Sequence, residues 1–298
     1  MPNQSVLEKF FAFVEYNGFA FPVDYKANLC EVAAHFDKDT INPSGPYSLH
    51  TEYSYGKRNF SSSLISNYPA LVEAHKSYVP QLWKSEEWAV AFANFLIDLT
   101  KEKAPPSIIE IHPPFNDYCT ADMFSERFQA FEKHVHTVYP EVLILIENRA
   151  GTVYRGGKFL FGTAKEIVSL CDLIKRDKLC LGIVLDFPQL LTAERIDPIN
   201  FNVPKYQLAI HSISEYQSMI KGIHIWGKKK STTGRWVAHS GTLNTYFGGD
   251  DTTKEAFLSG IRKICSDGQS RFLVPEVNSN EDDLSSIIKD LEHCFYLQ

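Results

Sequence analysis

The chain has 298 residues, of which 44% are hydrophobic and 22% are charged, and its formal net charge is −6. This composition excludes a disordered or fibrous protein and allows a substantial buried core. It also excludes a protein that coats nucleic acid through bulk positive charge, and leaves room only for a local basic patch.

The cysteines and the apolar runs exclude further classes of protein. The six cysteines are scattered without a C-x-x-C pair, so we expect reduced thiols and neither a disulfide framework nor a thiolate metal site. The N-terminus lacks the basic and apolar segments of a signal peptide, and no apolar run approaches the roughly 20 residues that span a bilayer. We therefore expect a cytoplasmic protein without a membrane partner.

Taken in chain order, short apolar runs alternate with segments of helical period. The strand candidates are residues 18–23, 47–53, 70–75, 108–112, 143–147, 179–186, 220–226 and 272–276. A helix is expected at 27–36, and longer helices at 88–99 and 124–138, where apolar side chains recur on one face. Thr163 with Glu166, and Thr252 with Glu255, are expected to form capping boxes at helix starts.

Eight strands that alternate with helices predict one (β/α)8 barrel, a TIM barrel, which occupies residues 1–298 as a single domain. A doubly wound open sheet is the alternative α/β architecture. Neither a G-x-G-x-x-G motif nor a P-loop follows any strand candidate, so the usual nucleotide-binding open sheets lack their signature here.

Polar residues close six of the apolar runs. In a barrel the active site lies at the C-terminal ends of the strands, so these residues would share one mouth. They are His75, His112, Glu147, Asp186, His224 and Glu276. A divalent cation is the simplest way to offset three neighbouring carboxylates, and imidazole with carboxylate suits Zn, Mn or Fe. Taken singly, each residue also has an ordinary alternative, either a loop position or a hydrogen-bonded place in the core.

Four segments, ILIENRAG, GIVLDFPQ, IKGIHIW and VPEVN, resemble the endonuclease IV-type AP endonucleases. That family belongs to the xylose-isomerase-like barrels, which include UV damage endonucleases and many sugar isomerases and epimerases. The resemblance runs from Ala70 to Asn278 and implies two metal sites bridged by Glu147. One ion would be held by His75, His112 and Glu147, and the other by Glu147, Asp186, His224 and Glu276.

Two residues depart from the family's pattern. Gln189 stands where the family has a histidine, and Val237 stands where it has an acidic residue two positions before the histidine matched by His239. Both losses affect the third metal of the family's trinuclear site, so the resemblance better supports a binuclear site of Zn or Mn. His239 then contacts substrate, acts as an acid, or is an ordinary loop histidine.

Two divalent ions about 3.5–4 Å apart can deprotonate a bridging water and stabilise charge on a phosphoryl oxygen. This chemistry predicts a metal-dependent phosphodiester hydrolase that acts on nucleic acid, as in DNA repair, or on a small phosphodiester. The expected catalytic residues are Glu147, Glu276, His239 and Arg149. The expected substrate-binding residues are Gln189, Trp226 and the cations Lys228, Lys229, Lys230 and Arg235, which lie in an expected loop at 227–235.

Several alternatives stay open. Arg149 could instead form a structural ion pair, and Tyr118, Tyr154 and Trp236 could stack on bases or simply pack. Three polar residues of the segment 49–60 either line the mouth or belong to a strand and its loop: His50, Glu52 and Arg58.

The main functional alternative is a single-metal sugar isomerase or epimerase. It would need only the quartet Glu147, Asp186, His224 and Glu276, and the histidines expected at strands three and four would then be incidental. A third possibility is a barrel that has lost catalysis and binds a ligand. Substrate, metal and oligomeric state stay open at this point.

Overall fold

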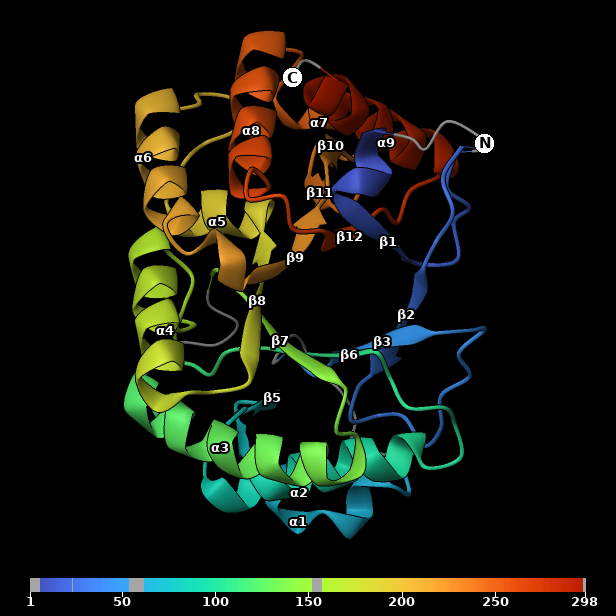
Figure 1. Ribbon diagram of the computed structural model, residues 1–298, viewed down its shortest axis with the longest axis vertical. Coiled ribbons are helices and arrows are strands. Elements are labelled where there is room, and N and C mark those ends of the chain that lie inside the picture. The colour runs from blue at the N-terminus through green and yellow to red at the C-terminus, as the bar shows by residue number, and fades with distance from the viewer. Residues whose placement is uncertain (1–5, 23, 54–61, 152–156, 297–298) are drawn as a thin grey trace. The chain divides into compact units, whose positions relative to one another are not determined.

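The computed structural model describes residues 6–22, 24–53, 62–151 and 157–296. Eight strands form a closed barrel in the order β1-β12-β9-β8-β7-β6-β3-β2 (Figure 1). Their bounds are β1 Phe11–Glu15, β2 Leu29–Ala34, β3 Tyr47–Thr51, β6 Ile108–Ile111, β7 Leu143–Glu147, β8 Leu181–Asp186, β9 Ile220–Ile225 and β12 Arg271–Pro275. The expected TIM-barrel fold is confirmed.

Helices connect the barrel strands. The α-helices are α1 Pro69–Glu73, α2 Glu86–Thr100, α3 Ala121–Val138, α4 Ala164–Asp177, α5 Phe187–Ala193, α6 Val203–Ser214, α7 Leu243–Tyr246, α8 Asp251–Ile264 and α9 Glu281–Tyr296. Short 3-10 turns are η1 Val6–Lys9, η2 Ile65–Asn67 and η3 Gln217–Met219. Two small antiparallel hairpins are separate from the barrel sheet: β4 His75–Lys76 with β5 Val79–Pro80, and β10 Lys228–Lys230 with β11 Trp236–Ala238.

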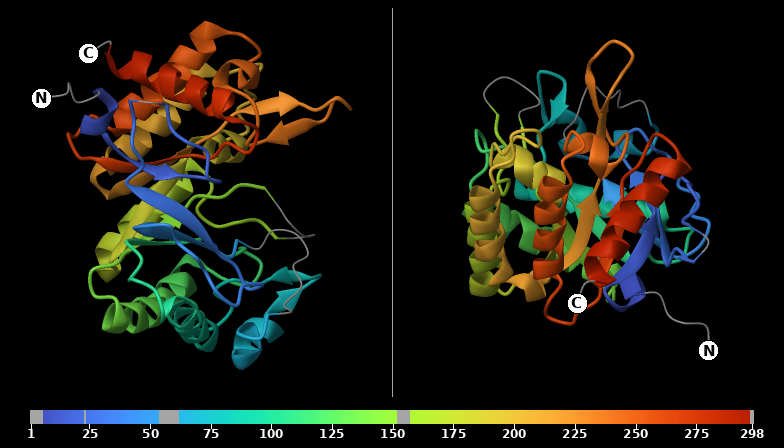
Figure 2. Two further views of the ribbon diagram at one scale, coloured as in Figure 1. Left: turned by 90° about the vertical axis from the view of Figure 1, so that its right-hand side faces the viewer. Right: turned by 90° about the horizontal axis from the view of Figure 1, so that it is seen from above.

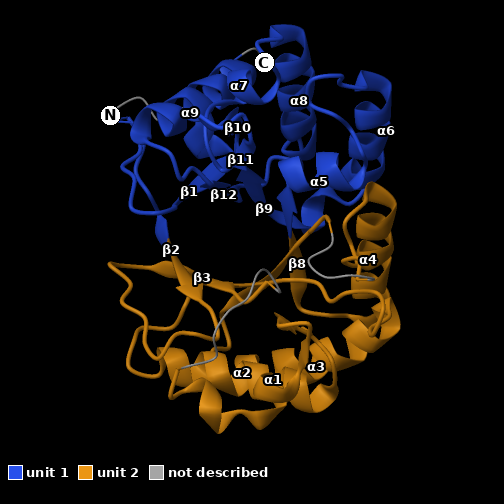
Figure 3. Ribbon diagram, turned by 180° about the vertical axis from the view of Figure 1, so that it is seen from behind, with its two compact units in different colours: residues 1–30, 184–298 blue, residues 31–183 orange. Residues whose placement is uncertain are grey.

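The chain divides into two compact units, which are coloured separately in Figure 3. Unit 1 comprises residues 1–30 and 184–298, and unit 2 comprises residues 31–183. Each unit carries its own apolar packing and its own set of polar strand-end residues.

In unit 2 an aromatic core lies beneath the paired helices α2 and α3. Helix α2 begins at the N-cap Ser85, whose side chain accepts a hydrogen bond from the Trp88 backbone. Phe92 of α2 stacks on Phe131 of α3 with ring centroids 5.3 Å apart, and the fully buried Trp83 contacts both rings. The Trp83 indole also donates to the backbone oxygen of His112 at 2.7 Å. The aromatic core therefore fixes the backbone at the end of β6.

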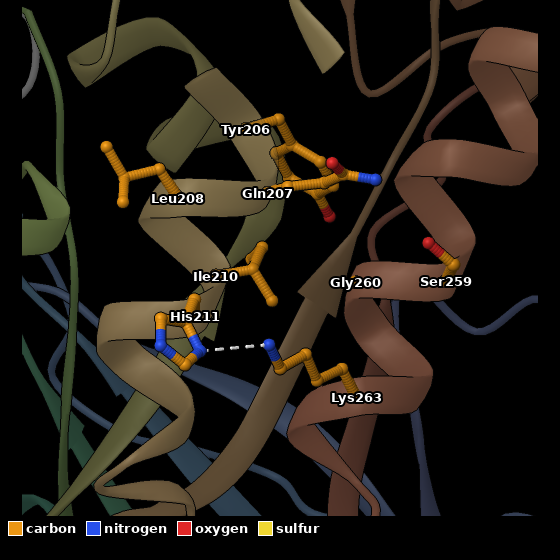
Figure 4. A pocket seen from close by; sticks show the side chains of 8 residues that line it. All are labelled: Tyr206, Gln207, Leu208, Ile210, His211, Ser259, Gly260 and Lys263. Atoms are coloured by element: carbon orange, nitrogen blue, oxygen red, sulfur yellow. Dashed lines mark hydrogen bonds between the residues drawn. The ribbon is translucent and has the colours of Figure 1, made fainter. Parts of the chain in front are cut away.

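In unit 1 the helices α6 and α8 pack side by side (Figure 1). Gly260 of α8 faces the fully buried Tyr206, and a Cβ at this position would lie 2.7 Å from the tyrosine Cζ. The Tyr206 hydroxyl donates to the backbone oxygen of Phe257 at 2.7 Å. A cavity of about 470 Å³ lies along these two helices, and the His211 ring and Lys263 ammonium meet there at 3.2 Å (Figure 4). A glycine is therefore needed where the two helices approach.

The first third of the chain corrects three of the expected elements. The expected strand at 18–23 is wrong, because its described residues are irregular and Gly18 lies in a turn with φ of +70°. The expected helix at 27–36 is also wrong, because this segment forms β2. Leu29, Val32 and Phe36 are spaced like a helical face, and such a short run does not separate the two periods. The barrel therefore begins with β1 and β2.

The expected strand at 70–75 is the third error. Pro69 occupies the first turn of α1, where its fixed φ and missing N–H suit a helix start. Leu71 is the buried apolar residue of this helix. His75 follows in the two-residue strand β4, which pairs with β5 and not with a barrel strand. His75 consequently does not end a barrel strand.

One of the two expected capping boxes is present. Thr163 and Glu166 cap α4 reciprocally, as expected. The box at Thr252 and Glu255 is wrong, because α8 begins earlier and its N-cap is Asp250, whose carboxylate accepts from the Thr252 and Thr253 backbones. Aspartate is preferred over threonine at the N-cap position of a helix, which agrees with a start at Asp250.

Candidate metal centre

Unit 2 gathers two histidines and two carboxylates, which we call the unit 2 cluster. It consists of His50, Glu110, His112 and Glu147. His50 of β3 lies in register with Glu110 of β6, and His112 stands two residues further on, so its side chain faces the same side as Glu110. Glu147 is the last residue of the neighbouring strand β7. Ligand atoms from the four side chains all lie within 4.8 Å of one another.

The imidazoles of the unit 2 cluster converge on one carboxylate oxygen. The Nε2 atom of His112 donates to Glu147 Oε2 at 2.8 Å, since a carboxylate can only accept. The Nε2 atom of His50 lies 3.7 Å from the same oxygen and 3.7 Å from Glu110 Oε1. The side chains of His112 and Glu147 are 0% and 1% exposed, so this contact is shielded from water.

The pKa values of the two histidines in the unit 2 cluster are shifted in opposite directions. Burial disfavours the charged form of His50, but the carboxylates of Glu31, Glu147 and Glu110 outweigh it and raise its pKa to about 9. Burial lowers the pKa of His112 to about 4, although Glu147 opposes this. At neutral pH, His50 is therefore an imidazolium and His112 a neutral imidazole.

Glu147 is held ionised although it is buried. Burial disfavours its charged form, but the Arg149 guanidinium and the two histidines keep its pKa well below the ordinary value. Arg149 Nη1 lies 3.5 Å from Glu147 Oε1, and its guanidinium lies 5.0 Å above the Tyr53 ring. This is the structural ion pair that was the alternative for Arg149. A catalytic role of the same residue stays a prediction.

The unit 2 cluster fits a divalent transition metal. Two imidazoles and two carboxylates are the mixed nitrogen and oxygen set that suits Zn, Mn or Fe. In a tetrahedral site with bonds of about 2.0–2.1 Å, neighbouring ligand atoms lie about 3.3 Å apart. The observed separations of 2.8 and 3.7 Å bracket that spacing. Metal-capable residues are thus clustered as predicted, with partly different members.

Unit 1 holds a second group, the unit 1 cluster, which consists of Asp186, His224, His239 and Glu276. The Glu276 carboxylate lies close to both histidines, with His224 Nδ1 3.4 Å from Oε1 and His239 Nδ1 3.4 Å from Oε2. Ligand atoms of Asp186 and His224 lie within 4.8 Å of each other. Asp186 ends β8 and caps α5 through a 2.8 Å hydrogen bond from the Gln189 backbone. Three members of the expected quartet, Asp186, His224 and Glu276, therefore lie in unit 1 together with His239, whereas Glu147 belongs to unit 2.

Trp226 holds the unit 1 cluster in place. Its indole N–H donates to Asp186 Oδ2 at 2.9 Å, and its ring stacks on His239 with centroids 4.5 Å apart. His239 has a φ of +56°, a conformation that costs energy for a non-glycine residue and persists only where its surroundings hold it. The Lys228 ammonium lies 5.1 Å from the Trp226 ring, where burial lowers its pKa and Asp186 opposes this. These contacts place Trp226 where it orients Asp186 and His239, and its expected contact with substrate stays a prediction.

The basic stretch forms a hairpin and not the expected loop. Strands β10 and β11 pair Lys228 with Ala238 and Lys230 with Trp236, and the hairpin extends away from the rest of unit 1 (Figure 2). Lys229 forms an ion pair with Asp283 at 3.2 Å, and the Lys230 ammonium lies 5.4 Å from the Trp236 ring. The hairpin contains the fourth cation, Arg235, next to Trp236. Binding of substrate by these cations stays a prediction.

The sequence-based ligand set differs from the clusters at four residues, one of which is His239, expected near the substrate and found beside Glu276. His75 lies in β4, and we do not place it in the unit 2 cluster. His50 takes the strand-three position expected for His75, and was foreseen only as one possible residue of the mouth. Glu110 was missed. A charged residue inside the fully buried strand Ile108–Ile111 is the signal that could have found it, because buried charges need partners.

The remaining expected residues are readily placed. Gln189 contacts Asp186 through its backbone, whereas Val237 is exposed on β11. Glu52 is fully buried and accepts a hydrogen bond from the Phe36 backbone. Tyr118 packs beside Phe115 and donates to the Leu82 backbone. Arg58 and Tyr154 lie outside the described residues, and so the expectations for them stay predictions.

No described helix is both long and apolar enough to cross a bilayer. A bridging role of Glu147 between two ions also stays a prediction.

Comparison with known proteins returned neither a matching family model nor a matching curated protein. Among solved structures, the chain is similar to AsfvAP:AG, with 14% identity, coverage of 86% of this chain and 85% of that chain, and a TM-score of 0.48. It is also similar to the GH53 catalytic domain of Ignisphaera aggregans, with 12% identity, coverage of 98% and 92%, and a TM-score of 0.49. The probable 3-DHS dehydratase AsbF of Bacillus anthracis gives 10% identity, coverage of 90% and 77%, and a TM-score of 0.42.

Proposed function

We propose that the protein is a metal-dependent phosphodiester hydrolase. The observation that carries the proposal is the unit 2 cluster, in which His50 and His112 stand at the third and fourth barrel strands beside two carboxylates. A single-metal sugar isomerase does not require histidines at these two strands, whereas a two-metal phosphodiesterase does. The presence of both histidines therefore favours hydrolysis.

The unit 1 cluster supports a second ion. Asp186, His224 and Glu276 offer two carboxylates and an imidazole, and His239 adds a second imidazole on Glu276. Each unit thus contains a donor set of the type that binds Zn or Mn. Two donor sets favour two ions per chain over the single ion that an isomerase needs.

The residues around the clusters suit an anionic substrate. Divalent ions bound there would activate water and stabilise the charge that develops on a phosphoryl group. Arg149 presents a guanidinium next to Glu147, and guanidinium groups donate paired hydrogen bonds to phosphate oxygens. Glu276 orients both histidines of the unit 1 cluster and is the candidate for holding a proton during reaction.

The β10–β11 hairpin offers cations for a phosphate backbone. Lys228, Lys230 and Arg235 would contact phosphates beyond the bond that is cleaved, and such contacts weaken steeply with salt. This supports nucleic acid as the substrate in preference to a sugar. A net charge of −6 implies that attraction comes from this hairpin and the bound cations and not from the whole surface.

The metal content of each unit tests the proposal. Protein purified without chelator or metal resin should contain two ions per chain by elemental analysis. His50→Ala with His112→Ala should remove one ion, and His224→Ala should remove the other. His75→Ala is the matched histidine control, and we expect it to retain both ions; loss of an ion in this variant would restore the sequence-based ligand set.

Activity assays separate the two reaction classes. The wild type should hydrolyse bis(4-nitrophenyl) phosphate and cleave an oligonucleotide, and both activities should fall with either metal-deficient variant. A single ion per chain together with aldose–ketose interconversion would overturn the proposal and establish an isomerase.

A further inference from the structure

A small cavity lies beside the unit 1 cluster and belongs to neither donor set. Its volume is about 250 Å³, and it is lined by Asp197, Pro198, Ile199, Lys228, Trp236 and Tyr246. These residues come from the connection between α5 and α6, from the β10–β11 hairpin and from α7. The volume lies just below the roughly 300–1,000 Å³ of pockets for drug-sized ligands, so it suits a single ring-sized group.

Aromatic and apolar side chains form the walls of this cavity. Tyr246 is buried, whereas Trp236 is 48% exposed and Ile199 is 51% exposed at the rim. Exposed apolar side chains that gather in one place, with polar residues around them, mark binding sites more often than single exposed residues do. The walls therefore favour a flat ligand that can stack on an aromatic face.

Two charged groups of opposite sign also line the cavity. The Lys228 ammonium lies 5.6 Å from the Tyr246 ring and 5.1 Å from the Trp226 ring, so aromatic faces hold it. Asp197 is exposed, and a hydrogen bond from the Ile199 backbone holds its pKa below the ordinary value. The cavity thus presents donors on Lys228 and an acceptor on Asp197.

We propose that this cavity binds a planar heterocycle that carries both a hydrogen-bond acceptor and a donor on its edge, as nucleobases do. The ring would stack on Trp236, its carbonyl would accept from Lys228, and its amino or imino group would donate to Asp197. This inference goes beyond the proposed hydrolysis, because it requires neither a bound metal nor a phosphate.

The β10–β11 hairpin has two faces, and residues on the face away from the cavity provide control variants. Lys228, Lys230 and Trp236 share one face, because directly paired residues and next-but-one residues of an antiparallel hairpin lie on the same side. Lys229 and Val237 lie on the other side, where Lys229 pairs with Asp283. Val237→Ala therefore matches Trp236→Ala in exposure and strand, and Lys229→Met matches Lys228→Met in charge.

Nucleoside binding to the full chain, measured by saturation-transfer NMR, tests the proposal. Adenosine, guanosine, cytidine and uridine carry no phosphate, so attraction to the basic hairpin does not contribute. We expect at least one nucleoside to bind with base protons in closest contact, and ribose to bind at least about tenfold more weakly. Trp236→Ala and Lys228→Met should each weaken this binding about tenfold, while the two control variants leave it unchanged.

Three outcomes would overturn the inference. They are an absence of nucleoside binding to the wild type, equal binding of ribose, and equal binding of benzyl alcohol, which has a ring without the donor and acceptor edge. Because Trp236 is half exposed, its truncation leaves the core intact, and thermal unfolding confirms that each variant is folded. Binding without hydrolysis would refute the proposed function alone, and hydrolysis without nucleoside binding would refute this inference alone.

Discussion

Metal binding by the unit 2 cluster should release one proton at neutral pH, and that proton should come from His50. A metal ligand must be an unprotonated imidazole, whereas the neighbouring carboxylates raise the pKa of His50 to about 9. His112 contributes no proton, because its pKa of about 4 leaves it neutral. Glu147 is already ionised. The proton count therefore identifies a single residue.

The magnitude follows from the distance between the working pH and the pKa of His50. At pH 7 the imidazolium must be deprotonated about two pKa units below its midpoint, which costs about 2.7 kcal/mol. The apparent metal affinity should therefore rise about 100-fold between pH 7 and pH 9 and level off above that. Proton release should fall from nearly one per ion at pH 7.5 to none well above pH 9.

Isothermal titration calorimetry with Zn or Mn in two buffers of different ionisation enthalpy measures the released proton. The titration is done on His224→Ala, so that the unit 1 cluster is weakened and the unit 2 cluster accounts for the signal. Adding His50→Gln should abolish the proton release and the pH dependence and weaken binding at pH 9.

Two results would refute the reasoning. Equal affinity at pH 7 and pH 9 without proton release would mean that His50 is not both protonated and a ligand. A proton release that persists in His50→Gln would mean that another group supplies it.

Three further variants test the fold and the site. Gly260→Ala should destabilise the protein by about 2 kcal/mol in thermal unfolding, because the added Cβ crowds the Tyr206 ring and overpacking costs about 1–3 kcal/mol; Gly45→Ala, at an open position, should be nearly neutral. Thr163→Ala should cost about 1 kcal/mol through loss of the capping box, and a change under a few tenths would show that water replaces the cap. Arg149→Met should lower kcat for phosphodiester hydrolysis about 10²-fold with metal content unchanged; an unaltered kcat would leave Arg149 as a structural ion pair only.

The later barrel strands could be predicted because each is a short, mainly apolar run between turn or helix signals. Leu143–Glu147, Leu181–Asp186 and Ile220–Ile225 are each bounded by turns or helices, as expected for strands covered on both faces. The first two strands could not be predicted in the same way. Phe11–Glu15 lies in an apolar pattern that begins at Val6 and fits a helical period, with apolar residues at 6, 7, 10, 11 and 14, and Leu29–Ala34 fits a helical period as well as a strand.

Errors at the start of the chain propagated into the site. The total of eight strands was right, but two expected members were not barrel strands, and the histidine on the third barrel strand is His50 and not His75. The unit 1 cluster was less affected, because Asp186 and His224 lie in strands that were correctly placed and Glu276 directly follows another. Glu110 could not be predicted as a site residue, because it stands in the middle of an apolar strand and not at its end. Only the register of β6 with β3 shows that it lies opposite His50.

The β10–β11 hairpin has a consequence for how this barrel can diversify. Its two strands pair with each other, Lys228 opposite Ala238 and Lys230 opposite Trp236, and form a two-stranded sheet that is separate from the barrel sheet. Insertions, deletions or charge reversals at its tip would leave the register of β9 with β12 intact. Substitutions at the tip would therefore change the surface that the hairpin presents, while the barrel strands that carry Asp186 and His224 keep their positions.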